Sequence, residues 1–147
     1  MRSHENLLDE AVQLALRNRA QGGRPFGAVI ARDGEVVATG VNDTVRTHDF
    51  TAHAEMEAIR AACRRLDKPD LAGCTVYASG HPCPMCLCAL AMAGAEAVYY
   101  AFSNEDAAAY GFASTGAYAS TRLPLEPPPL PLRQLALGRS ARDLDAP

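Results

Sequence analysis

The chain has 147 residues, a length that fits one ordinary domain. Apolar residues make up 48% of the sequence, which is enough for a packed core and excludes wholesale disorder. The formal net charge is -3 and no run of Lys or Arg stands out, so a basic nucleic-acid-binding face and a nucleic acid partner are not expected. No window approaches the roughly 20 apolar residues that span a bilayer, so no membrane partner is expected either.

The cysteines indicate a reducing environment. There are five of them, an odd number, and the N-terminus has no apolar stretch of the signal-peptide kind. We therefore expect a cytoplasmic protein with reduced thiols. In such a protein a C-x-x-C spacing indicates metal or redox chemistry rather than a structural disulfide.

The first part of the chain predicts a helix followed by a β-hairpin. Ser3 is a suitable N-cap, and apolar residues from Leu7 to Leu16 recur at helical spacing. Asp33-Gly34 is a strong turn signal between two apolar runs, so strands are expected at 26–31 and 36–39.

The central part predicts helices that alternate with short strands. After a polar loop at 42–49, a helix is expected to open at Thr51 or His53 and to stop at Pro69 and Gly73. The remaining expected elements are a strand at 75–78, a helix at 83–92, a strand at 97–102 and a short helix at 105–110 capped by Asn104. The order α-β-β-α-β-α-β-α predicts a mixed sheet packed by helices in layers.

A single domain, 1–147, is expected to end in a proline-rich tail at 123–147. The run Glu126-Pro127-Pro128-Pro129-Leu130-Pro131 cannot form a regular helix or sheet, so a stiff extended spacer is predicted there. The residues that follow show no clear period, and no internal repeat or second domain is visible.

Two segments separated by thirty positions offer metal ligands. His53-Ala54-Glu55 supplies an imidazole beside a carboxylate, and Pro82-Cys83-Pro84-Met85-Cys86 supplies two thiols at C-x-x-C spacing. Three ligands, with the fourth position left for water, are typical of a catalytic rather than a structural zinc site. We therefore expect one Zn²⁺ per subunit, held by His53, Cys83 and Cys86, with a bound water or hydroxide. The pattern H-x-E…P-C-x-x-C also matches a known signature of zinc-dependent base deaminases.

The position of these residues suits the chemistry. Both segments lie at predicted helix starts, where unpaired N–H groups and the helix dipole favour thiolates. Two thiolates cancel the charge of Zn²⁺, so the bound water should be less acidic than at an all-histidine site, where its pKa is about 7. A nearby base is then useful. Glu55 could take a proton from the water and pass it to a leaving amine, which would depart as ammonia.

Several alternatives remain open on the residues alone. By ideal helix spacing Glu57 is better placed relative to His53 than Glu55, which is preferred on the motif match. Cys63, Cys74 and Cys88 are expected as packed thiols, although Cys88 or Cys74 could be the fourth ligand of a non-catalytic structural zinc module. A tRNA or RNA base deaminase and a C-x-x-C redox protein are the other rivals.

The chain resembles the cytidine deaminase-like superfamily, and within it the bacterial guanine deaminase and nucleoside deaminase branch, to which the tRNA adenosine deaminases are related. The resemblance runs from about Pro25 to Gly111 and rests on the stretches Arg24-Pro25-Phe26-Gly27-Ala28-Val29-Ile30, Val41-Asn42, Thr51-Ala52-His53-Ala54-Glu55-Met56, Pro82-Cys83-Pro84-Met85-Cys86-Leu87 and Asp106-Ala107-Ala108-Ala109-Tyr110-Gly111-Phe112.

The resemblance implies a three-layer α/β/α sandwich around a mixed five-stranded sheet. It also implies a hydrolase of purine metabolism that acts on a small-molecule substrate, with Glu55 as the proton shuttle. Asn42 and the backbone N–H of Ala54 would hold polar edges of the base, and Phe26 would pack against its ring. In guanine deaminases the C-terminal segment is exchanged within a dimer and closes the partner's pocket, so a homodimer is expected, with the tail as the exchanged segment.

Two departures from the guanine deaminase pattern bear on the substrate. The chain has Gly80-His81-Pro82 where relatives carry Cys-Glu-Pro, and Phe112-Ala113-Ser114 lacks the acid that would accept from the 2-amino and N1–H groups of guanine. His81 and Ser114 are therefore candidate substrate-binding residues. A related nucleobase, a nucleoside or a triazine-type analogue is expected, unless an acid of the tail serves instead (Glu126, Asp143 or Asp145).

Overall fold

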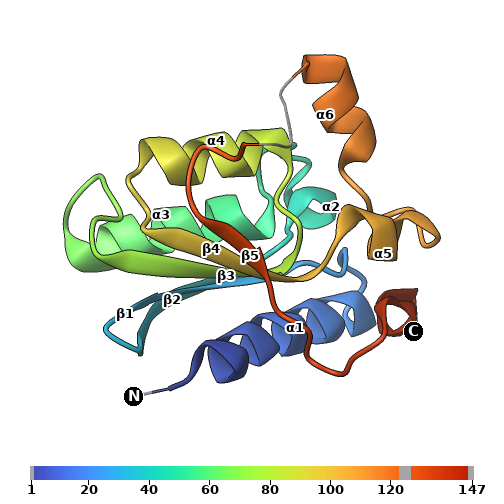
Figure 1. Ribbon diagram of the computed structural model, residues 1–147, viewed down its shortest axis with the longest axis horizontal. Helices are drawn as coiled ribbons and strands as arrows, with labels where there is room; N and C mark the ends of the chain where they lie inside the picture. Colours follow the sequence, from blue (N-terminus) through green and yellow to red (C-terminus); the bar gives the residue numbers. More distant parts are fainter. Residues whose placement is uncertain (1, 123–126, 146–147) are drawn as a thin grey trace.

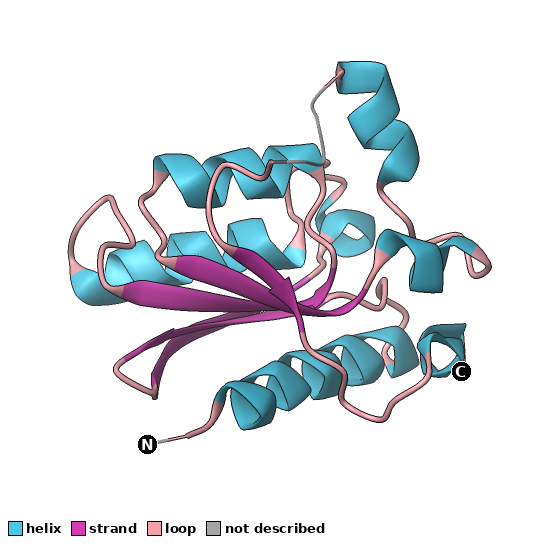
Figure 2. Ribbon diagram, viewed as in Figure 1, coloured by secondary structure: helices cyan, strands magenta, loops and turns pink. Residues whose placement is uncertain are grey.

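The computed structural model describes residues 2–122 and 127–145. A five-stranded sheet lies between two layers of helices, with α3 and α4 on one face and α1 on the other (Figures 1 and 2). The strands are β1 (Gly27–Arg32), β2 (Glu35–Val41), β3 (Cys74–Gly80), β4 (Ala97–Phe102) and β5 (Leu132–Gln134). The helices are α1 (His4–Ala20), α2 (Thr44–Thr47), α3 (Ala54–Leu66), α4 (Pro84–Met92), α5 (Asn104–Ala108) and α6 (Thr115–Thr121), followed by a 3₁₀ turn, η1 (Ala141–Asp145).

The sheet is mixed, with the strand order β2-β1-β3-β4-β5. β1 pairs antiparallel with both β2 and β3, whereas β3, β4 and β5 run parallel. α4 makes the crossover between β3 and β4, so the chain leaves the carboxyl end of β3 directly into α4. The helices α2, α5 and α6 gather at the end of the sheet where β4 ends (Figure 1). The predicted α/β/α sandwich is confirmed.

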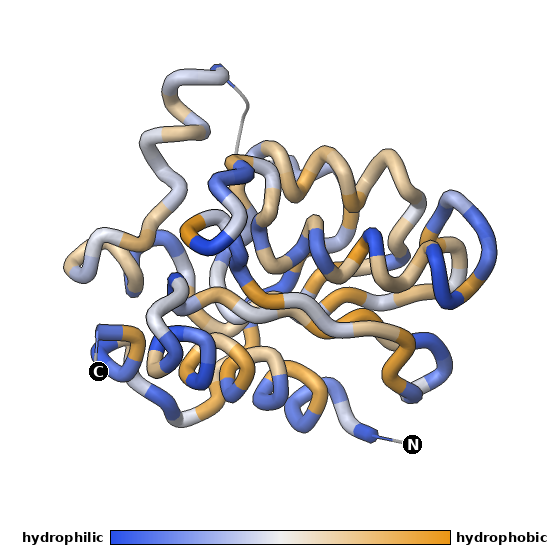
Figure 3. The backbone as a smooth tube through the Cα atoms, turned by 180° about the vertical axis from the view of Figure 1, so that it is seen from behind, coloured by the Kyte–Doolittle hydropathy of each residue, from blue (hydrophilic) through white to orange (hydrophobic). Residues whose placement is uncertain are grey.

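Apolar residues fill both sides of the sheet. β1 is buried on both faces: Ala28 and Ile30 pack with α3 and α4, and Val29 and Ala31 pack with α1. This explains why the strand is a continuous apolar run instead of an alternating one. α1, in contrast, is buried on one side only: its hydrophobic residues lie along one side of the helix and its hydrophilic residues along the other (Figure 3).

A glycine lets α3 approach the sheet. A Cβ atom at Gly40 would overlap the carbonyl oxygen of Ala54 and the backbone of Ala58. Because Gly40 has no side chain, the first turn of α3 packs directly on β2. This contact fixes the start of the helix that carries His53 and Glu55.

Most predicted elements are present, and Ser3 caps α1 by accepting from the N–H of Asn6. Two predictions need correction. The loop 42–49 contains a short helix, α2. The N-cap of α5 is Ser103 instead of Asn104, because Ser103 and Asp106 form a capping box in which each side chain accepts from the backbone N–H of the other residue.

In the region after α5 the residues alone indicated no element, although the resemblance implied a fifth strand. This region contains α6, β5 and η1, because β4 provides an edge for β5 and α1 provides an apolar surface for Leu144 of η1. Residues 123–126 and 146–147 of the predicted tail lie outside the described residues, and 127–131 form no helix or strand, as predicted. In the part of the chain that the structure describes, no helix has the length and apolar character needed to cross a bilayer.

Candidate metal centre

The two predicted ligand segments both occupy the position just before a helix. His53 is the N-cap of α3, with an extended backbone (φ -70, ψ 156), and Cys83 is the N-cap of α4 (φ -69, ψ 169). Neither side chain makes a capping hydrogen bond to its own helix, so both are free to point elsewhere. Pro84 begins α4, where its missing N–H costs nothing.

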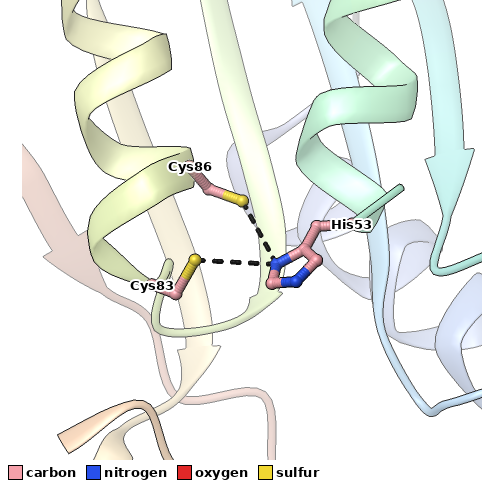
Figure 4. A group of neighbouring side chains, drawn as sticks. All are labelled: His53, Cys83 and Cys86. Carbon is pink, nitrogen blue, oxygen red and sulfur yellow. Dashed lines mark hydrogen bonds between the residues drawn. The ribbon is translucent and has the colours of Figure 1, made fainter. Parts of the chain in front are cut away.

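The structure brings His53, Cys83 and Cys86 together (Figure 4). The Nδ1 atom of His53 lies 3.5 Å from the Sγ of Cys83 and 3.6 Å from the Sγ of Cys86, and all three ligand atoms lie within 4.8 Å of one another. Tetrahedral zinc, with Zn–N near 2.05 Å and Zn–S near 2.3 Å, requires N···S separations of about 3.6 Å. The three residues therefore fit a zinc ion.

No fourth protein ligand completes this cluster among the residues the structure describes. Cys74 is fully buried in the core between the sheet and α3, and Cys88 is partly buried on α4. A structural zinc module, which needs a closed fourth position, is therefore not supported by the described geometry.

The interaction between the two thiols shifts their pKa values in opposite directions. The hydrogen bond between them lowers the pKa of Cys83 to about 4, with further help from His53, and it raises the pKa of Cys86, which is also buried. The hydrogen bond to Cys83 raises the pKa of His53. Binding of a divalent cation supplies the charge needed to remove the remaining proton, so metal binding should release protons.

Glu55 is the second residue of α3 and is only 7% exposed. Burial raises the pKa of Glu55 to about 7, and the negative charge of Cys83 acts in the same direction. A carboxyl group that titrates near neutrality can both accept and donate a proton at physiological pH.

The choice between Glu55 and Glu57 follows from the backbone. Because His53 precedes the helix, helical spacing does not apply to it, and both His53 and Glu55 line the same cavity. Glu57 instead forms an ion pair with Arg60 at 2.6 Å.

A cavity of about 320 Å³ opens beside the cysteines and is of a size usual for small-molecule sites. All five residues predicted to bind substrate line it: Phe26, Asn42, Ala54, His81 and Ser114. Sequence reasoning missed six more lining residues: Arg24, Thr44, Phe50, Phe112, Ala113 and Ala117. Arg24 and Phe112 belong to the stretches that carry the family resemblance, so the resemblance could have indicated these two residues as part of the site.

The amide of Asn42 has a defined orientation. Its Oδ1 accepts from the backbone N–H of Thr44 at 3.1 Å and from the Thr44 hydroxyl at 2.8 Å. A backbone N–H can only donate, so the oxygen must face Thr44. The Nδ2 group is therefore the part of Asn42 that is left to donate to a substrate.

Ser114 is oriented in a similar way by Asn104. The Oδ1 of Asn104 accepts from the backbone N–H of Ser114 at 2.8 Å and from its hydroxyl at 3.0 Å. The single hydroxyl proton is used in this bond, so only the lone pairs of Ser114 face other partners. The cavity thus has a neutral acceptor at this position.

Aromatic rings form the walls. Phe26 and Phe112 meet edge to face at 5.9 Å, and the exposed ring of Phe50 lies 5.7 Å from the ring of His53. The Nδ1 of His81 donates to the carbonyl oxygen of Pro82 at 2.9 Å, which holds its ring at the cavity wall near Cys83. Tyr118 donates to the same carbonyl at 2.7 Å.

Comparison with known proteins gives consistent matches. Residues 1–102 match the cytidine and deoxycytidylate deaminase zinc-binding region. The chain is 43% identical to the guanine deaminase of Bacillus subtilis (strain 168), over 92% of this chain and 87% of the relative, and the solved structure of that enzyme superposes with a TM-score of 0.79. A solved structure in complex with 2,6-diaminopurine is 26% identical, with a TM-score of 0.81 over 98% of this chain and 80% of that chain. A tRNA-specific adenosine deaminase of Aquifex aeolicus (strain VF5) is 41% identical, over 65% of this chain and 64% of the relative.

Proposed function

The chain belongs to the cytidine and deoxycytidylate deaminase family and is a zinc-dependent hydrolytic deaminase, and we propose that its substrate is a small, free, guanine-type heterocycle or a close analogue. The observation that carries the proposal is the cavity of about 320 Å³ that is lined jointly by His53, Cys83, Glu55 and three phenylalanine rings. The reaction replaces a ring C–NH₂ group by C=O with uptake of water and release of ammonia.

We assign His53, Cys83 and Cys86 as the zinc ligands, supported by the N···S distances of 3.5 and 3.6 Å. The bound zinc would supply positive charge that acidifies water and polarises the reacting carbon. His53 would bind through Nδ1, the atom that faces both thiols.

We assign Glu55 as the group that moves protons. Its carboxylate would take a proton from the attacking water and then deliver a proton to the amine, which leaves as ammonia. The buried position of Glu55 and its raised pKa, about 7, support both half-steps.

The other lining residues would hold the ring. Phe26 and Phe112 offer apolar edges, and the backbone N–H of Ala54 and the Nδ2 group of Asn42 offer donors. Ser114 offers one neutral acceptor where guanine deaminases have an acid, so an analogue or nucleoside with fewer ring N–H groups would fit as well as guanine.

The test is ammonia release from guanine, cytosine, adenine, their nucleosides and aminotriazines, with wild-type protein and Glu55→Gln. We expect kcat to fall by roughly 10²- to 10⁴-fold in the variant while zinc content stays at one per chain. Full activity of Glu55→Gln would refute the assigned role, and wild-type activity on none of the compounds would refute the substrate class.

A tRNA substrate is the second candidate, favoured by the similarity to the tRNA-specific adenosine deaminase. That similarity covers 65% of this chain, whereas the similarity to the guanine deaminase covers 92%. Editing of tRNA would show as tight, salt-sensitive binding of a tRNA stem-loop.

We also propose a homodimer in a reducing, cytoplasmic environment. α4 contains no charged residue and is hydrophobic on all sides (Figure 3), and Met85, Cys88, Ala89 and Met92 follow helical spacing on its partly exposed side. Met92 is 88% exposed, so a second copy of the chain would cover an otherwise open apolar surface. Light scattering should show a dimer that Met92→Glu dissociates; a monomeric wild type would refute the proposal.

β5 pairs with β4 of its own chain, and exchange of the tail between subunits stays a prediction.

A further inference from the structure

The polar groups that line the cavity are mainly donors. Asn42 is left with its Nδ2 group, and Arg24 contributes a guanidinium with five N–H groups. Ser114 provides the lone pairs of one neutral oxygen. The only carboxylate among the described lining residues is that of Glu55, which is buried beside the metal ligands. A substrate that matches this cavity should therefore be rich in acceptors at the edge away from the reacting carbon.

Arg24 is the exposed, positively charged residue of the cavity wall. Its Cζ atom lies 5.8 Å from the ring centroid of Phe26 and 6.0 Å from that of Phe112. The aromatic rings attract the cation but carry no oxygen acceptor for its N–H groups, so the five donors can bind a planar or tetrahedral oxyanion. No carboxylate of the described residues lies within 4.0 Å of Arg24, although five other basic side chains have such partners: Arg2, Arg46, Arg60, Lys68 and Arg139.

The backbone of Arg24 is held by a buried side chain. Asn18, 2% exposed at the end of α1, donates from Nδ2 to the carbonyl oxygens of Arg24 and Asn42, both at 2.8 Å. Its Oδ1 accepts from Arg46, and Gly23 packs directly against it. One amide therefore fixes the two donor residues of the cavity relative to each other.

We propose that Arg24 binds a negatively charged substituent of the substrate, and that the enzyme prefers an aminated heterocycle carrying a carboxylate or a phosphate over the neutral ring. The inference rests on the deaminase function proposed above and narrows its substrate class. Arg24 and Asn42 would read the anionic, acceptor-rich edge, while the amino group to be removed faces Glu55 and the metal ligands.

The test compares matched neutral and anionic compounds: pterin with pterin-6-carboxylate, and guanosine with guanosine 5′-monophosphate. We expect kcat/KM for at least one anionic compound to exceed that of its neutral partner by roughly 10- to 100-fold, the range for a charged hydrogen bond. The pterin pair reports on a carboxylate and the guanosine pair on a phosphate. The preference should weaken as salt concentration rises, because the guanidinium is exposed to solvent.

Two variants assign the preference to Arg24. Arg24→Met keeps an apolar chain against the two rings and removes the charge, so the ratio of kcat/KM values should fall to about one. Arg65→Met, an exposed arginine in the last turn of α3, should keep the wild-type ratio.

Equal kcat/KM values within both pairs, or a preference that persists in Arg24→Met, would overturn the inference. Absence of ammonia from every compound with zinc bound would instead refute the proposed function. In that case equilibrium dialysis of the two anionic compounds still decides about Arg24: weaker binding to Arg24→Met than to wild type supports an anion site, and equal binding refutes it.

Discussion

Replacement of Asn18 by Asp tests whether a single buried amide organises the cavity. The change keeps the size of the side chain but replaces the Nδ2 donor by an oxygen. That oxygen would face the carbonyl oxygens of Arg24 and Asn42, each 2.8 Å from Nδ2 in the native protein. Two hydrogen bonds are lost. The carbonyl oxygen of Asn42 loses this donor, whereas the carbonyl oxygen of Arg24 still accepts from the N–H of Phe26 at 2.8 Å.

The expected cost follows from these contacts. An unsatisfied buried polar group costs about 1–3 kcal/mol, and the attraction of the new carboxylate to Arg46, which already contacts Oδ1 at 2.8 Å, offsets part of this. We expect the free energy of unfolding to fall by about 1–3 kcal/mol. In a chain of this length that corresponds to a decrease in Tm of roughly 3–10 °C.

The assay is urea denaturation together with steady-state kinetics. Because Asn18 joins the segments that carry Arg24 and Asn42, KM should rise more than kcat falls. Asn6→Asp, an exposed change in the first turn of α1, serves as the control and should alter stability by less than about 0.5 kcal/mol. A loss below about 0.5 kcal/mol in Asn18→Asp, with unchanged KM, would show that the amide does not organise the cavity.

Three further predictions concern the metal, the substrate and acid stability. Cys83→Ser should weaken zinc binding by more than roughly 100-fold, because the loss of a residue that only hydrogen-bonds to a zinc ligand already costs roughly 10- to 100-fold. Competition with a chelator measures this affinity, and an unchanged affinity would show that Cys83 is not a zinc ligand. Ser114→Asp introduces an acid where guanine deaminases have one, so kcat/KM for guanine should rise about 10-fold or more relative to an anionic analogue. An unchanged ratio would show that residue 114 does not contact the substrate edge that carries the 2-amino and N1–H groups. The hydrogen bonds from Arg139 and Gln13 lower the pKa of Asp9 below its ordinary value of 3.8, so the pair stabilises the protein above that value and the contribution disappears as pH falls through the lowered pKa. Asp9→Asn should therefore cost up to about 1 kcal/mol at pH 7 and nothing at strongly acidic pH, as measured by urea denaturation at several pH values; a cost independent of pH would exclude this origin.

The elements predicted from sequence are those whose signals are local. Ser3 caps the helix that follows it, and Asp33-Gly34 forms the turn of the hairpin with positive φ at both residues. β5 depended on a distant partner, since three residues form a strand only where the edge of β4 is available. The cap of α5 was misplaced by one residue because Ser103 and Asn104 are both good caps, and Asn104 is used to hold Ser114.

The sequence by itself determined the chemical inventory of the site. An imidazole beside a carboxylate and two thiols at C-x-x-C spacing are two local patterns, and together they predict zinc-dependent removal of ammonia without any structure. The substrate class proposed above rests instead on groups that no spacing connects, among them Arg24 and Ser114.

Only the tertiary structure decided how the side chains of the site are placed and oriented. It placed His53 before the first turn of α3, which brings Glu55 rather than Glu57 into the cavity. It also set the directions of Asn42 and Ser114, because their partners, Thr44 and Asn104, consume specific lone pairs or protons. Whether such a side chain presents a donor or an acceptor to the cavity depends on which atoms it already bonds, and the sequence does not show these partners because they are brought together by folding.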